Sequence, residues 1–273
     1  MSNRPVFVVS DRTGITAEMM SHSLLTQFPN VKFDVTTLPF VDTDDKVSEV
    51  IKQINDAGEH TGVRPLIFLT FVDDAHRARL LDCGGVSFDL FGTFLDPLEQ
   101  ELDHKSSHSI GVSHGIVDPV KYTNRIGAVN YAVHCDDGLN VRDYPSADVI
   151  LVGVSRAGKT PVSLYLAMQF GVHCANYPLT DHDLERSNLP PALEDYRDRL
   201  FGLTIRPERL QQIRQERRNS SRYASIQQCR YELSQAEQLY LRYRIPSADT
   251  TSLSIEEIAT GIIQKLRLKR DIY

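Results

Sequence analysis

The residues whose types and spacing point most directly to chemistry form one short run between Gly153 and Thr160. The run reads Gly153-Val154-Ser155-Arg156-Ala157-Gly158-Lys159-Thr160, the Gly-x-x-x-x-Gly-Lys-Ser/Thr pattern of a phosphate-binding loop, or P-loop. Glycines at both ends permit the tight turns that aim successive backbone amides at a phosphate. Lys159 would contact the outer phosphate oxygens, and the Thr160 hydroxyl would hold Mg²⁺. The run therefore predicts a site for a nucleotide or polyphosphate.

The elements needed to position this loop are also present in the sequence. Val149-Ile150-Leu151-Val152 is a continuous apolar strand, and a helix is expected from Thr160 to Phe170. The N-terminus of that helix would add its partial positive charge to the site. The alternative is a glycine-rich turn followed by a chance Lys-Thr pair, but the strand–loop–helix context favours phosphate binding.

A P-loop alone does not choose between hydrolysis, phosphorylation of a small molecule and phosphorylation of a protein. No Asn-Lys-x-Asp guanine motif is present. Asp181 and Asp183 follow an expected strand over 172–179. They could hold a metal or cap the following helix, and the sequence favours neither.

Asp136-Asp137-Gly138 precedes the P-loop strand. Asp137 or Asp136 could serve as the general base that takes a proton from a hydroxyl nucleophile. Asp and Gly are also common in the turn that ends a helix, so a purely structural role is the alternative.

Arginines are concentrated in one stretch of a chain that is acidic overall. Their guanidinium groups favour bidentate contacts with phosphate, and they could also dock an acidic partner protein. Glu208 and Glu216 are interleaved, so a self-paired, solvent-exposed helix face is at least as good an interpretation. The arginines are Arg206, Arg209, Arg214, Arg217, Arg218, Arg222 and Arg230.

Two other loops carry polar residues that could take part in chemistry. Ser113-His114-Gly115 contains a histidine that could carry a proton or a phosphoryl group, or simply be solvated. Ser10-Asp11-Arg12-Thr13-Gly14 follows the first strand and opens a helix, where a doubly wound sheet binds its ligands. This second loop could be an anion site or only a helix cap.

The first third of the chain alternates apolar strands with amphipathic helices. Strands are expected at Val6–Val9, Phe33–Phe40 and Leu66–Leu69, with helices over residues 15–28 and 45–57. Continuous apolar strands that alternate with such helices predict a parallel sheet covered on both faces. The N-terminal part is therefore expected to be a small doubly wound parallel sheet.

We expect an α/β fold with an N-terminal α/β domain over residues 1–100. Residues from about 95 to 118 mix charge, histidine, serine and glycine, and a linker or mobile loop is assigned to residues 101–120. Residues 121–273 would form a P-loop α/β kinase domain with a helical tail. Its first helix is expected to begin at Asp118-Pro119 and to end near Cys135.

The composition sets limits on the function. The chain has 273 residues, a formal net charge of -6 and four cysteines, none at zinc-finger or redox spacing. An acidic balance argues against bulk binding of nucleic acid. Scattered thiols favour a reducing compartment. No signal-peptide core or membrane-length apolar run is seen, so we expect a cytoplasmic protein without a membrane partner.

Sequence blocks along nearly the whole chain, in a fixed order, carry a resemblance to a known family. Two of them are the P-loop block from Gly153 to Phe170 and Asp136-Asp137-Gly138. The other blocks are Val9–Glu18, Thr37–Phe40, His60–Leu66, Ala175–Pro178, Phe201–Ile205, Pro207–Leu210, Ser221–Ser225, Gln228–Arg230 and Ser254–Ala259. On these blocks, the chain resembles the family of bacterial phosphoenolpyruvate synthase regulatory proteins, whose relatives regulate pyruvate, phosphate dikinase. Many relatives carry serine or another small residue where this chain has Gly158, and glycine brings it closer to the standard P-loop.

The resemblance implies an ADP-dependent serine/threonine kinase that is also a phosphate-dependent pyrophosphorylase. Such proteins transfer a phosphoryl group from ADP to a threonine of phosphoenolpyruvate synthase and so inactivate it. They take this enzyme as substrate when the catalytic histidine next to that threonine is phosphorylated. They reverse the reaction with inorganic phosphate, which releases pyrophosphate. The cofactors expected are thus ADP, inorganic phosphate and Mg²⁺.

Other functions remain open at the level of the sequence. The same activities could act on pyruvate, phosphate dikinase, although the blocks over 201–230 are more similar to the phosphoenolpyruvate synthase branch. An ATP-dependent small-molecule kinase or a nucleotide-sensing module without catalysis would also need a P-loop. The charged, helical C-terminus is compatible with a homodimer and does not require one.

Overall fold

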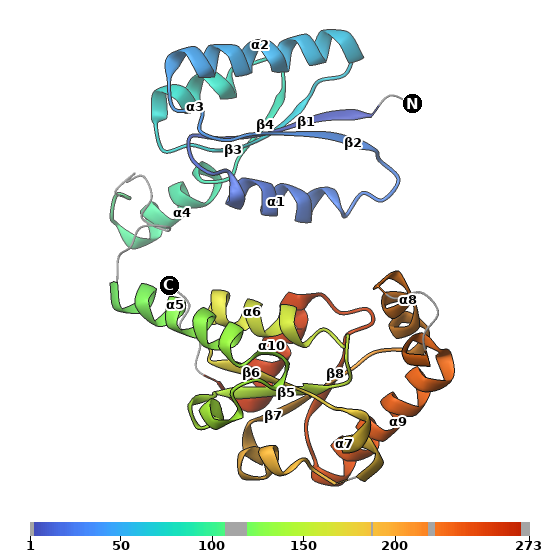
Figure 1. Cartoon of the computed structure of the whole chain (residues 1–273). Helices are drawn as coiled ribbons and strands as arrows, with labels where there is room; N and C mark the ends of the chain where they lie inside the picture. The colour runs from blue at the N-terminus through green and yellow to red at the C-terminus, as the bar shows by residue number, and fades with distance from the viewer. Residues whose placement is uncertain (1–2, 107–118, 187, 218–221, 269–273) are drawn as a thin grey trace. The chain divides into compact units, whose positions relative to one another are not determined.

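The computed structural model divides into two compact units, Met1–Gly115 and Ile116–Tyr273 (Figure 1). It describes residues 3–106, 119–186, 188–217 and 222–268. Each unit contains a four-stranded parallel sheet with helices, which confirms the expected two-part α/β fold. The division falls within the expected linker over 101–120. Ser113-His114-Gly115 and Asp118 lie outside the described residues.

The first unit is a doubly wound sheet, as its sequence pattern predicts. Its strands lie in the order β2-β1-β3-β4, and every neighbouring pair is parallel. The elements in chain order are β1 (Arg4–Ser10), α1 (Ile15–Leu25), β2 (Phe33–Leu38), α2 (Asp44–Thr61), β3 (Leu66–Thr70), α3 (Asp74–Leu81), β4 (Val86–Asp89) and α4 (Gly92–Leu102).

Alternate residues of the central strands pack against helices on opposite faces of this sheet. Phe7 and Val9 of β1 join a cluster with Val50 and Ile54 of α2. Val6 and Val8 join a second cluster, which includes Ala17 and Leu25 of α1. In Figure 1, α2 and α3 lie on one side of the sheet and α1 on the other. Burial on both faces explains why the strand sequence is continuously apolar.

The sequence did not predict α3, β4 or α4. Helix α4 continues to Leu102, so it includes residues from 95 onward whose mixed composition suggested a loop, and it reaches the start of the linker assigned to residues 101–120. The Asp89 side chain precedes this helix and satisfies amides at its start. Its Oδ1 accepts hydrogen bonds from the amides of Phe91 (3.1 Å) and Gly92 (2.9 Å). Charged residues in the helix and Pro97 gave it the composition of a loop.

The second unit contains the P-loop. Its strand order is β6-β5-β7-β8, again wholly parallel. The elements are α5 (Pro119–His134), η1 (Asp136–Gly138), η2 (Val141–Ser146), β5 (Val149–Gly153), α6 (Lys159–Phe170), β6 (Cys174–Pro178), α7 (Asp181–Arg186), η3 (Pro191–Arg199), β7 (Leu200–Thr204), α8 (Pro207–Arg217), η4 (Arg222–Ala224), α9 (Ile226–Tyr243), β8 (Ser247–Asp249) and α10 (Ile255–Leu266).

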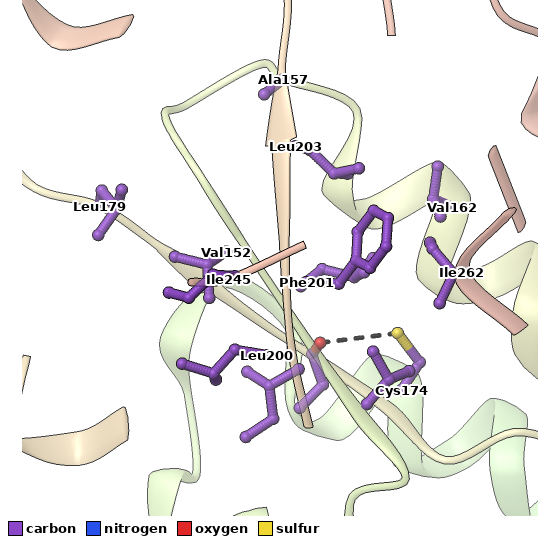
Figure 2. Packing of buried hydrophobic residues seen from close by; sticks show 14 of the residues in the cluster. Val152, Ala157, Val162, Cys174, Leu179, Leu200, Phe201, Leu203, Ile245 and Ile262 are labelled. Carbon is purple, nitrogen blue, oxygen red and sulfur yellow. Dashed lines mark hydrogen bonds between the residues drawn. The ribbon is translucent and has the colours of Figure 1, made fainter. Parts of the chain in front are cut away.

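One hydrophobic core spans this unit. It includes β5, Phe201 and Leu203 of β7, and Ile262 of α10, part of which is drawn in Figure 2. The helices α5, α6 and α10 lie on one side of the sheet, and α7 and α9 on the other (Figure 1). Among the described residues, no helix combines the length and apolar character needed to cross a membrane.

Both sheets place the first strand of the unit between the second and the third. In such a sheet, successive connections leave the first strand toward opposite sides, and ligands bind at the carboxyl ends of the strands beside this point. In the first unit the loop there is residues 10–14, after β1. In the second unit it is the P-loop, after β5. The strand order thus places two of the predicted loops at the same position in their respective sheets.

Candidate functional site

The candidate site is built on the loop between β5 and α6. Every residue of β5 is buried. The strand ends at Gly153, and α6 begins at Lys159. Arg156 and Gly158 adopt positive φ angles of 74° and 91°, which the tight turn requires. A Cβ on Gly153 would lie 2.8 Å from the carbonyl oxygen of Leu203, so only glycine fits there. The free amides at the start of α6 favour an anion at this position.

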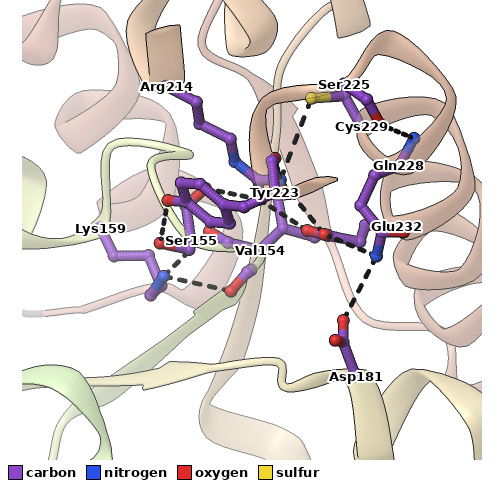
Figure 3. Close-up of polar contacts among 11 residues, drawn as sticks. Val154, Ser155, Lys159, Asp181, Arg214, Tyr223, Ser225, Gln228, Cys229 and Glu232 are labelled. Atoms are coloured by element: carbon purple, nitrogen blue, oxygen red, sulfur yellow. Dashed lines mark hydrogen bonds and ion pairs between the residues drawn. The ribbon is translucent and has the colours of Figure 1, made fainter. Parts of the chain in front are cut away.

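The side chain of Lys159 lies inside the loop and is only 5% exposed. Its ammonium donates hydrogen bonds to the carbonyl oxygens of Gly153 (3.1 Å) and Val154 (3.0 Å), the latter visible in Figure 3. Burial lowers the pKa of Lys159 to about 8, and the nearby carboxylates of Asp137 and Asp136 oppose this shift. A bound phosphate would supply a negative charge to this desolvated cation.

Thr160 and Asp136 lie side by side, although they come from different elements. The Thr160 hydroxyl donates a hydrogen bond to the Asp136 carboxylate, with 2.9 Å between Oγ1 and Oδ1. The amide nitrogen of Asn176, on β6, donates to the same Oδ1. Asn176 is completely buried, whereas Asp136 is only partly buried. The carboxylate of Asp136 is therefore fixed beside the P-loop from two directions.

The turn formed by Asp136–Gly138 gives the two aspartates different surroundings. Asp137 and Gly138 adopt φ angles of 52° and 74°. The amide of Asp137 donates to the side-chain oxygen of Asn176 at 2.9 Å. The Asn176 side chain thus contacts the carboxylate of Asp136 and the backbone amide of Asp137. The Asp137 side chain is exposed.

The predicted site residues Lys159, Thr160, Asp136 and Asp137 are thus brought together. The turn over Asp136-Asp137-Gly138 follows α5 and also places the Asp136 carboxylate beside the loop, so the structural role is observed and the catalytic role stays a prediction. The Thr160 hydroxyl and the Asp136 carboxylate are hard oxygen donors of the kind Mg²⁺ prefers, so the residues fit this ion. No cluster of three or more His, Cys, Asp or Glu side chains suited to a metal occurs in the described part of the chain. Mg²⁺ commonly uses few protein ligands together with phosphate and water.

Asp183 caps α7. Its Oδ2 accepts from the Thr180 amide at 2.9 Å, and its own amide donates to the Thr180 hydroxyl at 3.4 Å. This reciprocal arrangement is a capping box. Asp181 accepts from the side chain of Gln228 at 3.4 Å. The geometry favours capping rather than metal binding for Asp183.

The arginine stretch separates into one buried residue and a set of exposed ones. Arg214 is completely buried, and its guanidinium pairs with the Glu232 carboxylate at 2.6 Å. It is therefore neither part of a solvent-exposed helix face nor free to contact phosphate. Arg230 pairs with Glu208 at 3.0 Å on the surface. The exposed arginines are Arg206, Arg209, Arg217, Arg222 and Arg230, and Arg218 lies outside the described residues.

In the loop over 10–14 of the first unit, Ser10 and Asp11 form hydrogen bonds with the end of β3 and the residues after it. The Ser10 hydroxyl accepts from the Thr70 hydroxyl at 3.0 Å, and an Asp11 oxygen accepts from the Val72 amide at 2.8 Å. Gly14, with a φ of 75°, occupies the N-cap position of α1. The contacts favour a structural role for this loop.

Three residues that support the P-loop were not singled out from the sequence. Asn176 fixes the aspartates, and Tyr223 contacts Ser155 through its hydroxyl at 2.8 Å. Thr250, after β8, donates to the carbonyl oxygens of Ala157 (3.3 Å) and Thr204 (3.1 Å). The one amide side chain inside the strand expected over 172–179 was a signal that could have identified Asn176.

Comparisons with known proteins match the whole chain. A family model described as kinase/pyrophosphorylase matches residues 6–263. A protein of Alkalilimnicola ehrlichii is 51% identical over 272 residues, covering 100% of this chain and 99% of the relative. One from Bordetella avium is 53% identical over 267 residues, covering 98% and 97%. Both carry the name "putative phosphoenolpyruvate synthase regulatory protein".

Proposed function

Because the chain belongs to the kinase/pyrophosphorylase family, we propose that it regulates a phosphoenolpyruvate synthase by reversible phosphorylation of a threonine. In the inactivating direction, ADP donates its β-phosphoryl group to the threonine hydroxyl. In the activating direction, inorganic phosphate removes this group as pyrophosphate. The names of the relatives support the choice of target.

The kinase reaction needs a phosphate cradle, a cation beside the transferred group and a base. The amides of the loop over 153–160 bind the diphosphate of ADP, and the Lys159 ammonium neutralises charge that develops on the transferred phosphoryl group. The threonine oxygen attacks the β-phosphorus, and the bond from that phosphorus to the bridging oxygen breaks. AMP leaves, and the hydroxyl proton passes to a carboxylate.

Asp137 is the better candidate for that base. Its side chain is exposed next to the buried ammonium of Lys159, whose pKa it influences. The carboxylate of Asp136 already accepts hydrogen bonds from Thr160 and Asn176. We therefore assign proton transfer to Asp137 and the support of Thr160 to Asp136.

Thr160 and Asp136 would hold Mg²⁺, which would supply positive charge to the phosphate oxygens. The chemistry of this donor pair, a hydroxyl and a carboxylate in direct contact, supports the assignment.

The reverse reaction uses the same groups. An oxygen of inorganic phosphate attacks the phosphorus of phosphothreonine, the bond to the threonine oxygen breaks, and pyrophosphate forms. The attacking phosphate gives its proton to Asp137, and the departing threonine oxygen takes that proton from Asp137, so the carboxylate returns to its starting state. One loop can serve both directions, because it binds the β-phosphate of ADP in one and inorganic phosphate in the other.

The observation that carries this proposal is the convergence of Lys159, Thr160 and Asp136 at the carboxyl end of β5. It joins the two sequence blocks that hold the predicted chemistry, the P-loop and Asp136-Asp137-Gly138, through a direct 2.9 Å hydrogen bond. A chance Lys-Thr pair in a glycine turn would not require a carboxylate fixed by a buried amide beside it.

The proposal is tested by a phosphotransfer assay with phosphoenolpyruvate synthase that carries its catalytic phosphohistidine. ADP labelled at the β-phosphate and ATP labelled at the γ-phosphate are supplied in parallel reactions. We expect label on a target threonine from ADP alone. Label from ATP alone would reject the proposed donor. If neither nucleotide labels this enzyme, and ADP labels pyruvate, phosphate dikinase in a further reaction, the proposed target is rejected. We propose further that the reaction takes place in the cytoplasm, where the target enzyme would be encountered.

A further inference from the structure

Arg214 places a buried cation directly against the P-loop. It lies on α8, is 0% exposed, and forms two hydrogen bonds with Glu232 of α9: Nη2 to Oε2 at 2.6 Å and Nη1 to Oε1 at 3.1 Å. Its Nη2 also donates to the carbonyl oxygen of Ser155 at 3.1 Å, and Figure 3 shows this group of residues. Two helices are thus connected to the loop through one side chain.

Tyr223 holds the same loop residue at a second point. Its hydroxyl lies 2.8 Å from the Ser155 hydroxyl, and its ring lies 4.1 Å from the guanidinium carbon of Arg214. The carbonyl oxygen of Tyr223 accepts from Nη1 of Arg214 at 2.9 Å. Ser155 is therefore fixed through its backbone by Arg214 and through its side chain by Tyr223.

The peptide that Arg214 holds is one of those that must be oriented for phosphate binding. In a trans peptide the C=O and N–H groups point in opposite directions. A hydrogen bond that fixes the Ser155 carbonyl therefore also fixes the direction of the Arg156 amide. Arg156 has a φ of 74°, a left-handed conformation that a residue other than glycine seldom adopts without support from its surroundings.

The stability of the fold alone does not account for this arrangement. Buried ion pairs contribute little net stability, because desolvation offsets the attraction between the charges. Moreover, the Nε of Arg214 is buried, and no described atom accepts a hydrogen bond from it. A well-packed apolar pair would fill the same space without this cost.

We infer that Arg214 and Tyr223 are positioning residues that set the P-loop in its phosphate-binding conformation before the nucleotide arrives. Glu232 orients Arg214 in turn. This inference rests on the proposed binding of a nucleotide at the loop, and it goes beyond the proposed function by assigning loop geometry to α8, η4 and α9. Preorganisation lowers the entropy lost on binding, so its removal should weaken affinity.

The test uses the double variant Arg214→Met/Glu232→Leu, which removes both charges and keeps much of the buried volume. Its matched control is Arg230→Gln/Glu208→Gln, since that pair also joins α9 to α8 but lies on the surface, with side chains 64% and 65% exposed. Tyr223→Phe removes only the hydroxyl contact with Ser155. Affinities for ADP and for pyrophosphate are measured by calorimetric titration at 25 °C, and thermal unfolding is followed in parallel.

We expect the double variant to bind both ligands about tenfold or more weakly, and Tyr223→Phe about threefold more weakly, because each loses contacts that fix the loop. The control should bind like the unaltered protein. If the double variant and Tyr223→Phe both fold and both bind ADP and pyrophosphate with unchanged affinity, the inference is overturned. If the double variant fails to fold, unchanged affinity in Tyr223→Phe alone overturns it.

The unaltered protein separates this inference from the proposed function. If it binds pyrophosphate but not ADP, the proposed donor is rejected, and the variants still test the inference with pyrophosphate. If it binds neither ligand, both the proposed function and the inference are overturned.

Discussion

Asp136 and Asp137 are neighbours in the sequence, but their side chains have different surroundings. Asp136 accepts from Thr160 and Asn176, whereas the Asp137 side chain is exposed. We predict that Asp137→Asn lowers kcat of the kinase reaction by roughly 10²–10⁴-fold, the usual contribution of a general base, with little change in ADP affinity. Steady-state kinetics and calorimetric titration check this.

Asp136→Asn is the matched comparison. It preserves the shape of the side chain but weakens the acceptor for Thr160, so we expect a higher Mg²⁺ concentration to be needed for half-maximal rate. An Asp137→Asn protein with undiminished kcat would contradict the assignment of the base, whatever the behaviour of Asp136→Asn.

The lowered pKa of Lys159 predicts a pH dependence of nucleotide binding. Burial lowers this pKa to about 8, and the phosphate of ADP binds the protonated form more tightly. Binding therefore raises the pKa of Lys159. Affinity should be highest below about pH 8 and should fall as the pH rises through this value, by up to about tenfold per pH unit. Titrations with ADP between pH 7 and pH 9.5 measure it.

The control is Lys159→Met, whose weak residual binding should show no such decline over the same range. If the unaltered protein and Lys159→Met showed parallel pH profiles, another titrating group would be responsible for the decline.

At the scale of the elements, the close approach of β5 and β7 depends on Gly153. A Cβ at this position would lie 2.8 Å from the Leu203 carbonyl oxygen, a backbone atom that cannot move alone. We predict that Gly153→Ala lowers the free energy of unfolding by about 1–3 kcal/mol, as overpacking does, and weakens nucleotide binding as well. Urea denaturation measures the first effect.

Gly261→Ala provides a control in the same unit. Gly261 lies within α10, and a Cβ there would meet no atom within 4 Å. Alanine favours the helix, so the free energy of unfolding should rise by up to about 1 kcal/mol. Equal effects of the two substitutions would contradict the account of Gly153.

The elements that the sequence predicts well are those whose signals are local. The P-loop is a contiguous motif between an apolar strand and a helix, and β1, β3 and β5 are continuous apolar runs. The alternation of strands and helices also predicts the parallel sheets, because parallel strands need crossover connections. Asp136 and Asp137 could be named as candidates for the same reason: they stand together before the P-loop strand.

The contacts that complete the site come from distant parts of the chain. Asn176 on β6 reaches Asp136 across 40 residues, and Tyr223 reaches Ser155 across 68 residues. Arg214 resembles its exposed neighbours in sequence, and only its packing against Glu232 makes it a buried residue. A single sequence can mark Asn176 as a polar residue within a strand, but it contains no signal for which residue each of these side chains contacts. The short strands β4 and β8 were missed because three or four residues do not establish a period.

At the scale of the whole molecule, the two units have separate hydrophobic cores. We predict two unfolding transitions by calorimetry. Saturating ADP should raise the midpoint of only one of them, that of the unit over 116–273, because the P-loop belongs to it. At an ADP concentration of 100 times Kd, the stabilisation is about 2.7 kcal/mol.

Lys159→Met should leave both transitions in place and abolish most of the ADP-dependent shift. An ADP-dependent rise in the other transition, or in both equally, would contradict the assignment of the nucleotide site to one unit.

In the proposed mechanism, one P-loop serves both directions of the reaction. Comparing Lys159→Met with the unaltered protein in two assays on the same preparation shows whether it does. One follows transfer from ADP to the target threonine, and the other follows phosphate-dependent release of pyrophosphate from the phosphorylated target. We predict that both rates fall by about 10³-fold or more, since the same ammonium stabilises the transferred group in each direction. Loss of the kinase reaction with retention of phosphate-dependent release would contradict the single site.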